Sequence, residues 1–194
     1  MTNPKIRRKQ INIFKNKTKD LELEGIISLD ESSFDSHIQH NYGWSKYGTK
    51  KVIIKTNKRV RYTLLCATGY KNIINYKIVK NSADKMIFLK FIKQLIRKLD
   101  KNKKYYIIMD NCRIHHSKIF KEYMKKYNNI EIIYNVPYSP ESNPIEKVFS
   151  ELKKYIKDDT SDKLEINKLI IGAINNIKNK NIKQYFIKSL NFYK

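Results

Sequence analysis

The stretch Tyr105-Tyr-Ile-Ile-Met-Asp110 is an apolar run that ends in a carboxylate, which predicts a buried β-strand with an aspartate at its end. A second run of the same kind, Gly25-Ile-Ile-Ser-Leu-Asp30, lies earlier in the chain. In open α/β sheets, functional side chains commonly gather at strand ends. We therefore expect Asp30 and Asp110 to project from the ends of two strands.

Further elements are predicted between these two runs. Residues 60–68 and 73–79 are strand candidates joined at Gly69-Tyr70, so we expect them to pair as a hairpin. An amphipathic helix should follow, with Asn81 or Ser82 as its N-cap. Its apolar residues recur at a helical period, at Met86, Leu89, Ile92, Leu95, Ile96 and Leu99.

After the second aspartate, residues 118–127 predict a short helix and residues 130–136 a strand, and a helix starts near Asn143. Segments 164–177 and 182–190 are also helical in pattern. Three consecutive strands followed by alternating helices and strands favour an α/β fold. We expect a mixed five-stranded sheet, with three antiparallel strands, two parallel strands and helices on its faces.

The length of 194 residues fits one domain, which we place at residues 24–194. Residues 1–23 are basic and polar, and Ile11, Ile13 and Phe14 are their one apolar cluster. This segment is predicted to be a basic N-terminal arm or short helix that docks weakly if at all.

The charge of the chain favours a polyanionic partner, because 41 Lys and Arg against 18 Asp and Glu give a formal net charge of +23. Abundant Lys, Ile, Asn and Tyr are also what an A+T-rich genome produces, so codon bias explains part of the excess. Apolar runs are too short to span a bilayer, and no secretory leader opens the sequence. We expect no membrane association and an intracellular, reducing compartment: a prokaryotic cytoplasm, or a eukaryotic nucleus or viral site.

The two cysteines, Cys66 and Cys112, fall inside candidate strands without Cys-x-x-Cys spacing. The sequence therefore suggests neither a disulfide framework nor a zinc site.

Glu146 is a third carboxylate of interest, although its surroundings also have a purely structural interpretation. Asn143 as N-cap, Pro144 at the first helical position and Glu146 at the third form a capping-box pattern. On a helical wheel, however, Glu146 lies roughly 100° from Ile145, on the shoulder of the apolar face. From that position a carboxylate can face a cleft while the helix stays packed.

Each carboxylate taken alone could be a turn or cap residue, whereas three together suit one particular chemistry. Mg²⁺ and Mn²⁺ prefer oxygen ligands, and a few carboxylates with substrate phosphate oxygens can hold two ions roughly 3.5 to 4 Å apart. Such a pair of ions would also offset the mutual repulsion of the carboxylates.

Four strings in the chain resemble the successive signatures of mariner-type DDE transposases and their bacterial insertion-sequence relatives. They are Leu29-Asp-Glu-Ser-Ser-Phe34, Tyr42-Gly-Trp-Ser-Lys-Tyr-Gly48, Met109-Asp-Asn-Cys-Arg-Ile-His115 and Pro137-Tyr-Ser-Pro-Glu-Ser-Asn-Pro-Ile-Glu146. All four occur in the family's order, and the proline-rich string is the most specific. The resemblance covers residues 25–157 and implies a ribonuclease-H-like fold, with which the predicted element order agrees.

The resemblance also implies roles for individual residues. Asp30, Asp110 and Glu146 would be the catalytic triad that binds two Mg²⁺ or Mn²⁺ ions, with Asn111 and His115 as auxiliary active-site residues. For His115, an auxiliary or structural role is favoured over proton transfer. The implied activity is metal-dependent DNA phosphodiester cleavage and strand transfer, as in transposition and DNA integration.

The implied partners are transposon ends, target DNA and a second copy of the chain as a homodimer on DNA. Related enzymes recognise their ends with N-terminal helix-turn-helix modules, and the 29 residues before Asp30 are too few for these. Three interpretations stay open: the catalytic half of a split gene with a separate helix-turn-helix subunit, a fragment, or a remnant kept for another purpose. The alternative is a catalytically silent or regulatory DNA-binding derivative of a transposase.

Overall fold

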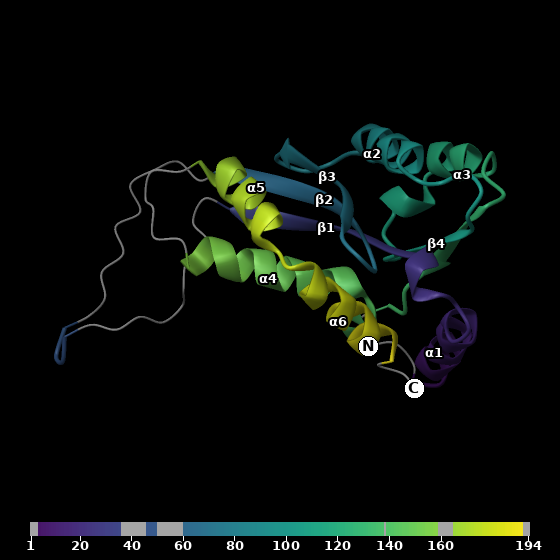
Figure 1. Cartoon of the computed structure of the whole chain (residues 1–194), viewed down its shortest axis with the longest axis horizontal. Coiled ribbons are helices and arrows are strands. Elements are labelled where there is room, and N and C mark those ends of the chain that lie inside the picture. The colour runs from purple at the N-terminus through teal and green to yellow at the C-terminus, as the bar shows by residue number, and fades with distance from the viewer. Residues whose placement is uncertain (1–3, 36–45, 50–59, 138, 159–164, 192–194) are drawn as a thin grey trace.

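The computed structural model describes residues 4–35, 46–49, 60–137, 139–158 and 165–191. Its centre is one five-stranded sheet in the order β3-β2-β1-β4-β5 (Figure 1). The strands are β1 (Ile26–Asp35), β2 (Arg61–Gly69), β3 (Ile73–Lys80), β4 (Tyr105–Met109) and β5 (Ile130–Tyr134). The helices are α1 (Pro4–Thr18), α2 (Lys85–Arg97), α3 (Lys118–Met124), α4 (Pro144–Asp158), α5 (Ile166–Asn176) and α6 (Asn179–Leu190).

The predicted mixed sheet is confirmed. Strand β2 is antiparallel to both β1 and β3, whereas β4 lies parallel to both β1 and β5. β2 and β3 form the predicted hairpin. β5 ends at Tyr134, two residues before the predicted end, and Asn135 and Val136 begin the segment that leads to α4.

Alternation along β1 sends its side chains into different cores on the two faces of the sheet. Ile27 and Leu29 pack in a core that α2 and α3 cover, while Phe34 packs in a core formed with α4 and α5. Figure 1 shows α2 and α3 on one side of the sheet and α4, α5 and α6 on the other. Because Ser28 and Asp30 alternate with Ile27 and Leu29, they face the α4 side.

Helix α2 begins later than predicted. Asp84 is its N-cap, and its carboxylate accepts hydrogen bonds from the backbone N–H groups of Met86 and Ile87, both at 2.8 Å. Asn81 instead has a positive φ of 65°, and its N–H donates to the carbonyl of Arg61. The prediction of Asn81 or Ser82 as N-cap was therefore wrong, because Asn81 belongs to the turn that leaves β3.

Helix α1 is more firmly packed than predicted. Residues 4–18 form a helix, and Phe14 is only 3% exposed within a core shared with β4, β5 and α6. Thr18 is also buried and donates from its hydroxyl to the carbonyl of Phe14. The expectation of weak docking was wrong, because one aromatic side chain of the segment fills a position in the core.

This packing predicts that Phe14→Ala will lower the free energy of unfolding by about 3 kcal/mol, the usual cost of truncating a buried phenylalanine. Urea denaturation followed by circular dichroism measures the change. The neighbouring Ile13→Ala is the matched control, since Ile13 is 49% exposed and should cost under about 1 kcal/mol. Equal losses for the two variants would contradict the packing of α1 described above.

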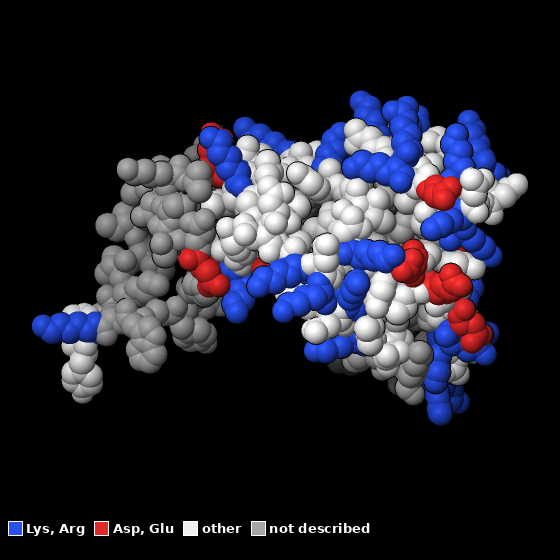
Figure 2. All heavy atoms as spheres, in the orientation of Figure 1, with Lys and Arg blue, Asp and Glu red and all other residues white. Residues whose placement is uncertain are grey.

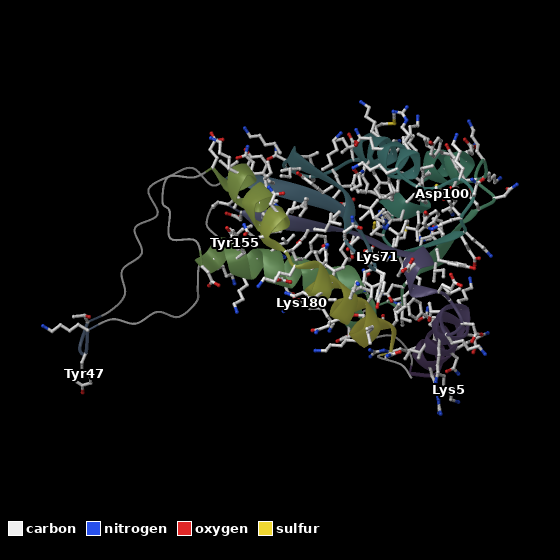
Figure 3. The ribbon with its side chains drawn as sticks, viewed as in Figure 1. Lys5, Tyr47, Lys71, Asp100, Tyr155 and Lys180 are labelled. Atoms are coloured by element: carbon white, nitrogen blue, oxygen red, sulfur yellow. The ribbon has the colours of Figure 1, made fainter. Side chains whose placement is uncertain are left out.

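Side chains also connect the helices on the α4 face. The hydroxyl of Tyr155, which is labelled in Figure 3, accepts a hydrogen bond from Asn176 on α5. Glu151 on α4 accepts hydrogen bonds from two α6 side chains, Asn181 at 2.9 Å and Tyr185 at 2.7 Å. These contacts link α4 to both C-terminal helices. No helix in the described ranges has the length and apolar character that a membrane span requires.

Candidate active site

The register between β1 and β4 brings the first two candidate carboxylates together. Ser28 pairs with Ile108, and Asp30 and Asp110 each lie two residues beyond that pair on parallel strands. Asp110 directly follows β4, as predicted. Asp30 does not end its strand, because β1 continues to Asp35 through its pairing with β2. It is β4 that ends here, and this leaves one side of Asp30 open to a cleft.

Glu146 comes from the first turn of α4, and that turn is fixed by a residue of β1. The hydroxyl of Ser28 accepts a hydrogen bond from the backbone N–H of Ile145 at 3.2 Å and donates to the side chain of Asn143. The capping-box interpretation is not supported, because the backbone N–H of Asn143 donates to the carbonyl of Pro140 and its side-chain oxygen accepts from Ser28. The side-chain amide of Asn143 donates to Asp30 at 3.1 Å. Asn143 therefore joins the start of α4 to the first carboxylate.

All three carboxylates line one cleft of about 520 Å³. The segments around it are β1, the loop after β4, the stretch after β5 and the start of α4. Its lining also includes Glu31, Asn111, Cys112, Asn135, Val136, Pro137, Ser139, Pro140 and Asn143. The fold thus gathers side chains from four separate parts of the sequence.

The electrostatics of the cleft favour a cation. Burial, with further contributions from the nearby charges of Asp110 and Glu146, raises the pKa of Asp30 to about 7, although the Glu31 backbone N–H opposes the shift. Burial likewise raises the pKa of Glu146, with Lys153 opposing and Asp110 adding to the shift. Among the described residues, no Lys or Arg forms an ion pair with Asp30 or Glu146. Within the described residues, Asp30 and Glu146 therefore have no ion-pair partner, whereas Asp110 pairs with His115.

The donor set of the cleft fits Mg²⁺ or Mn²⁺, since carboxylate oxygens are the ligands that these ions prefer. In the part of the chain that the structure describes, one group of three His, Cys, Asp or Glu side chains has its ligand atoms within 4.8 Å of one another, namely Asp110, Cys112 and His115. The three carboxylates of the cleft are therefore spread more widely than a single-ion site requires.

Asp110 is held by His115, one of the predicted auxiliaries. The two side chains lie 2.7 Å apart, and the Nδ1 of His115 also lies 3.1 Å from the backbone oxygen of Asp110. Burial alone would lower the pKa of His115, but the hydrogen bonds with Asp110 and Cys112 outweigh it and raise the pKa to about 10. Burial alone would raise the pKa of Asp110, but the hydrogen bond with His115 outweighs burial and lowers this pKa.

The other predicted auxiliary, Asn111, is exposed and its side-chain oxygen is hydrogen-bonded to the ring of His116. The His116 ring in turn stacks on Tyr134, with centroids 4.3 Å apart. Asn111 lines the cleft, so it stays close to the carboxylates while it secures the turn.

Two features of the site were missed from sequence. Cys112 lies in the turn after β4, so its placement in a strand, on which the interpretation without a zinc site depended, was wrong.

A buried network of hydrogen bonds also shapes the segment before α4. Asn135 donates to the carbonyl of Ser139 and accepts from Ser142, at 3.1 and 2.5 Å. Short polar residues near prolines are typical of any turn, so no pattern in the sequence singles them out.

Parts of the signatures lie outside the described residues. These are residues 42–45 of the second string and Tyr138 of the fourth. The end of the second string is described, and Tyr47 there is fully exposed.

Comparison with known proteins agrees with this geometry. The family model for the DDE superfamily endonuclease matches residues 25–166. The chain belongs to this DDE endonuclease family. The match begins just before β1 and extends through α4, so it includes every element that lines the cleft. The resemblance inferred from the four strings is confirmed.

A curated relative of this DDE endonuclease chain is the insertion element IS630 uncharacterized 39 kDa protein of Shigella sonnei. The two are 26% identical over 128 residues, which are 63% of this chain and 36% of the relative. The chain thus spans about a third of the length of that protein.

Solved structures of Mos1 transposase share the fold of the DDE endonuclease chain. The Mos1 mariner paired-end complex with Mn has a TM-score of 0.82 at 15% identity, and the match covers all of this chain and 62% of that one. The Mos1 catalytic domain with raltegravir and Mg has a TM-score of 0.75 at 14% identity, covering 100% and 94% of the two chains. The predicted ribonuclease-H-like fold is confirmed by these neighbours.

Proposed function

We propose that this chain is the catalytic core of a DDE transposase, which cleaves DNA phosphodiesters and transfers the cut strand. The observation that carries the proposal is the convergence of Asp30, Asp110 and Glu146 in one cleft, where no Lys or Arg of the described residues forms an ion pair with Asp30 or Glu146. These three side chains would hold two Mg²⁺ or Mn²⁺ ions. When bound, such ions supply activation of the attacking water or 3′-hydroxyl and stabilisation of the leaving oxygen.

The chain's own residues would hold the three carboxylates in place for this chemistry. Asn143 donates to one oxygen of Asp30, and the Glu31 N–H donates to the other. His115 holds Asp110 from the buried side of the loop. Ser28 fixes the first turn of α4 and with it the position of Glu146. Each proposed ligand therefore has a supporting contact, as preorganised sites require.

The partners we propose are transposon ends and target DNA. Figure 2 shows Lys and Arg side chains gathered over the region of α2 and α3, with few acidic ones between them, whereas near α1 cationic and acidic side chains are mixed. The exposed cations of α2 and α3 are Lys85, Lys90, Lys93, Arg97, Lys118 and Lys121. Such a surface contacts phosphates without reading bases, so binding should weaken steeply with salt.

The remaining partner proposals are a homodimer on paired ends and a separate helix-turn-helix subunit that recognises them. Similarity to an insertion-element protein of a bacterium supports an intracellular setting in which the DNA is accessible.

Metal binding by the folded chain should stabilise it. At a Mn²⁺ concentration 100 times the dissociation constant, we expect about 2.7 kcal/mol of added stability and a Tm higher by about 5 to 10 °C. Differential scanning calorimetry with and without EDTA measures this shift. Glu146→Gln should lose most of it, whereas Glu122→Gln, at an exposed α3 position, should keep it. An equal shift in both variants would place the metal elsewhere.

The activity itself is tested with DNA that carries the flanking inverted repeats of the element. The chain, with any helix-turn-helix protein encoded beside it, is incubated with this DNA and Mn²⁺ or Mg²⁺. Nicking at the repeat ends supports the proposal. Folded protein that binds DNA but neither nicks it nor binds two ions by titration calorimetry would instead be the silent derivative.

A further inference from the structure

The turn between β4 and α3 carries a second set of metal-ligating side chains, which shares only Asp110 with the carboxylate triad. Asp110, Cys112 and His115 each bring a ligand atom within 4.8 Å of the other two. They follow one another as Asp-x-Cys-x-x-His on a single turn. We propose that these three side chains bind a soft divalent cation such as Zn²⁺, and that its binding withdraws Asp110 from the catalytic cleft.

The ligand chemistry separates this site from the one in the cleft. A thiolate and an imidazole are ligands that Zn²⁺ takes readily, whereas Mg²⁺ and Mn²⁺ prefer oxygen. Asp110 is the one ligand acceptable to both kinds of ion. Zn²⁺ should therefore select the turn, and Mg²⁺ or Mn²⁺ the triad, and the two occupations compete for a single carboxylate.

The turn is already close to the required geometry. Backbone N–H groups of His115 and His116 donate to the carbonyls of Cys112 and Arg113, both at 3.2 Å, and these bonds close the turn. The His115 ring packs against Phe88, with centroids 4.6 Å apart. In a tetrahedral zinc site the ligand atoms stand about 3.3 to 3.8 Å apart. Side-chain rotations that move the ligand atoms by about 1 Å therefore suffice to form such a site.

A cation can reach the site from solvent, and the site has room for a fourth ligand. The Asp110 side chain is 47% exposed, and Cys112 is half-buried and lines the cleft. A water from the cleft can complete three protein ligands, as it does in open zinc sites. The cation takes the place of the proton shared between His115 and Asp110, and the thiol and imidazole protons are released to solvent.

The first test uses Cd²⁺ as a probe, because cadmium bound to a thiolate absorbs in the ultraviolet. Titration of the whole, metal-free chain should produce this band and saturate at one ion per chain. Cys112→Ser should remove the band, and His115→Ala should weaken Cd²⁺ binding about 10-fold or more. Cys66→Ala is the matched control, since Cys66 is fully buried in a core and should leave the band unchanged.

The second test measures competition without relying on activity. One equivalent of Zn²⁺ per chain should weaken Mn²⁺ binding at least about 10-fold by calorimetry in the wild-type chain, and much less in Cys112→Ser, whose turn lacks the thiolate. Where the wild type nicks DNA, Zn²⁺ should inhibit it at concentrations that Cys112→Ser tolerates. No Cd²⁺ band in the wild type, a band that survives Cys112→Ser, or equal Zn²⁺ effects in both proteins would overturn the proposal.

The competition half of this proposal rests on the proposed function, and Asp30→Asn separates the two. Asp30 belongs to the triad and not to the turn, so this variant should lose Mn²⁺-dependent nicking and keep the Cd²⁺ band. Loss of the band in folded Asp30→Asn would refute the separate site. Retention of nicking would refute the triad and leave the Cd²⁺ result standing.

Discussion

Asp110→Asn is expected to reduce DNA nicking by at least about 1,000-fold, which corresponds to about 4 kcal/mol of lost transition-state stabilisation. Asp110 follows β4 at the point where the cleft opens, and its side chain lines the cleft with Asp30 and Glu146 and also pairs with His115. An amide keeps the size of the carboxylate but loses its charge and most of its affinity for metal. The rate of nicking is measured on end-containing DNA in Mn²⁺ and in Mg²⁺.

Loss of activity must be separated from loss of structure, because the substitution also removes the partner of His115. Circular dichroism and urea denaturation should show a folded chain, since the Asp110 side chain is about half exposed. Asp100→Asn is a control, as this acid lies in the turn between α2 and β4. Nicking that survives in Asp110→Asn would refute the assignment of the triad.

Asn143→Ala is the second change with a large expected effect, although Asn143 is no proposed metal ligand. Its side chain is 1% exposed, donates to Asp30 and accepts from Ser28. Its loss should free Asp30 to turn and loosen the start of α4. We expect Mn²⁺ affinity to fall 10- to 100-fold, the usual cost of losing a residue that orients a metal ligand. Isothermal titration calorimetry measures the change.

A purely structural asparagine provides the comparison. Asn75 on β3 is also buried, at 5% exposed, and its amide nitrogen has no partner among the described residues. Asn75→Ala should alter the free energy of unfolding but leave Mn²⁺ affinity unchanged. If Asn143→Ala behaves in the same way, with a stability change alone, then Asn143 supports the fold and does not position Asp30.

The sequence predicted the sheet because its strands carry strong local signals. The apolar runs before Asp30 and Asp110, the hairpin around Gly69 and the periodic residues of α2 each identify an element without reference to the rest of the chain. Boundaries were less accurate. Asn81 and Asp84 are both good cap residues by type, and only the tertiary turn after β3 decides between them.

The site was predictable to the extent that it depends on strand ends and on a recognisable set of strings. What sequence could not supply is the register between β1 and β4, which places Asp30 in the middle of a strand beside Asp110. It also could not show that Asn143 bonds to a residue 113 positions earlier in the chain. Contacts over such distances follow from the packing of α4 on the sheet, and no local pattern records them.

The hydrogen bonds that Glu151 accepts from Asn181 and Tyr185 bear on how small this nuclease core can be made. The family match ends at residue 166, yet α5 completes the core under α4, and α6 and α1 complete the core that they share with β4 and β5. A chain shortened to residues 25–166 would keep all three carboxylates but would lack Ile182 and Phe186. The core residues that these two side chains cover would then be exposed to water. Conserving the chemistry of the cleft is therefore not enough; its walls depend on residues that the recognisable region leaves out.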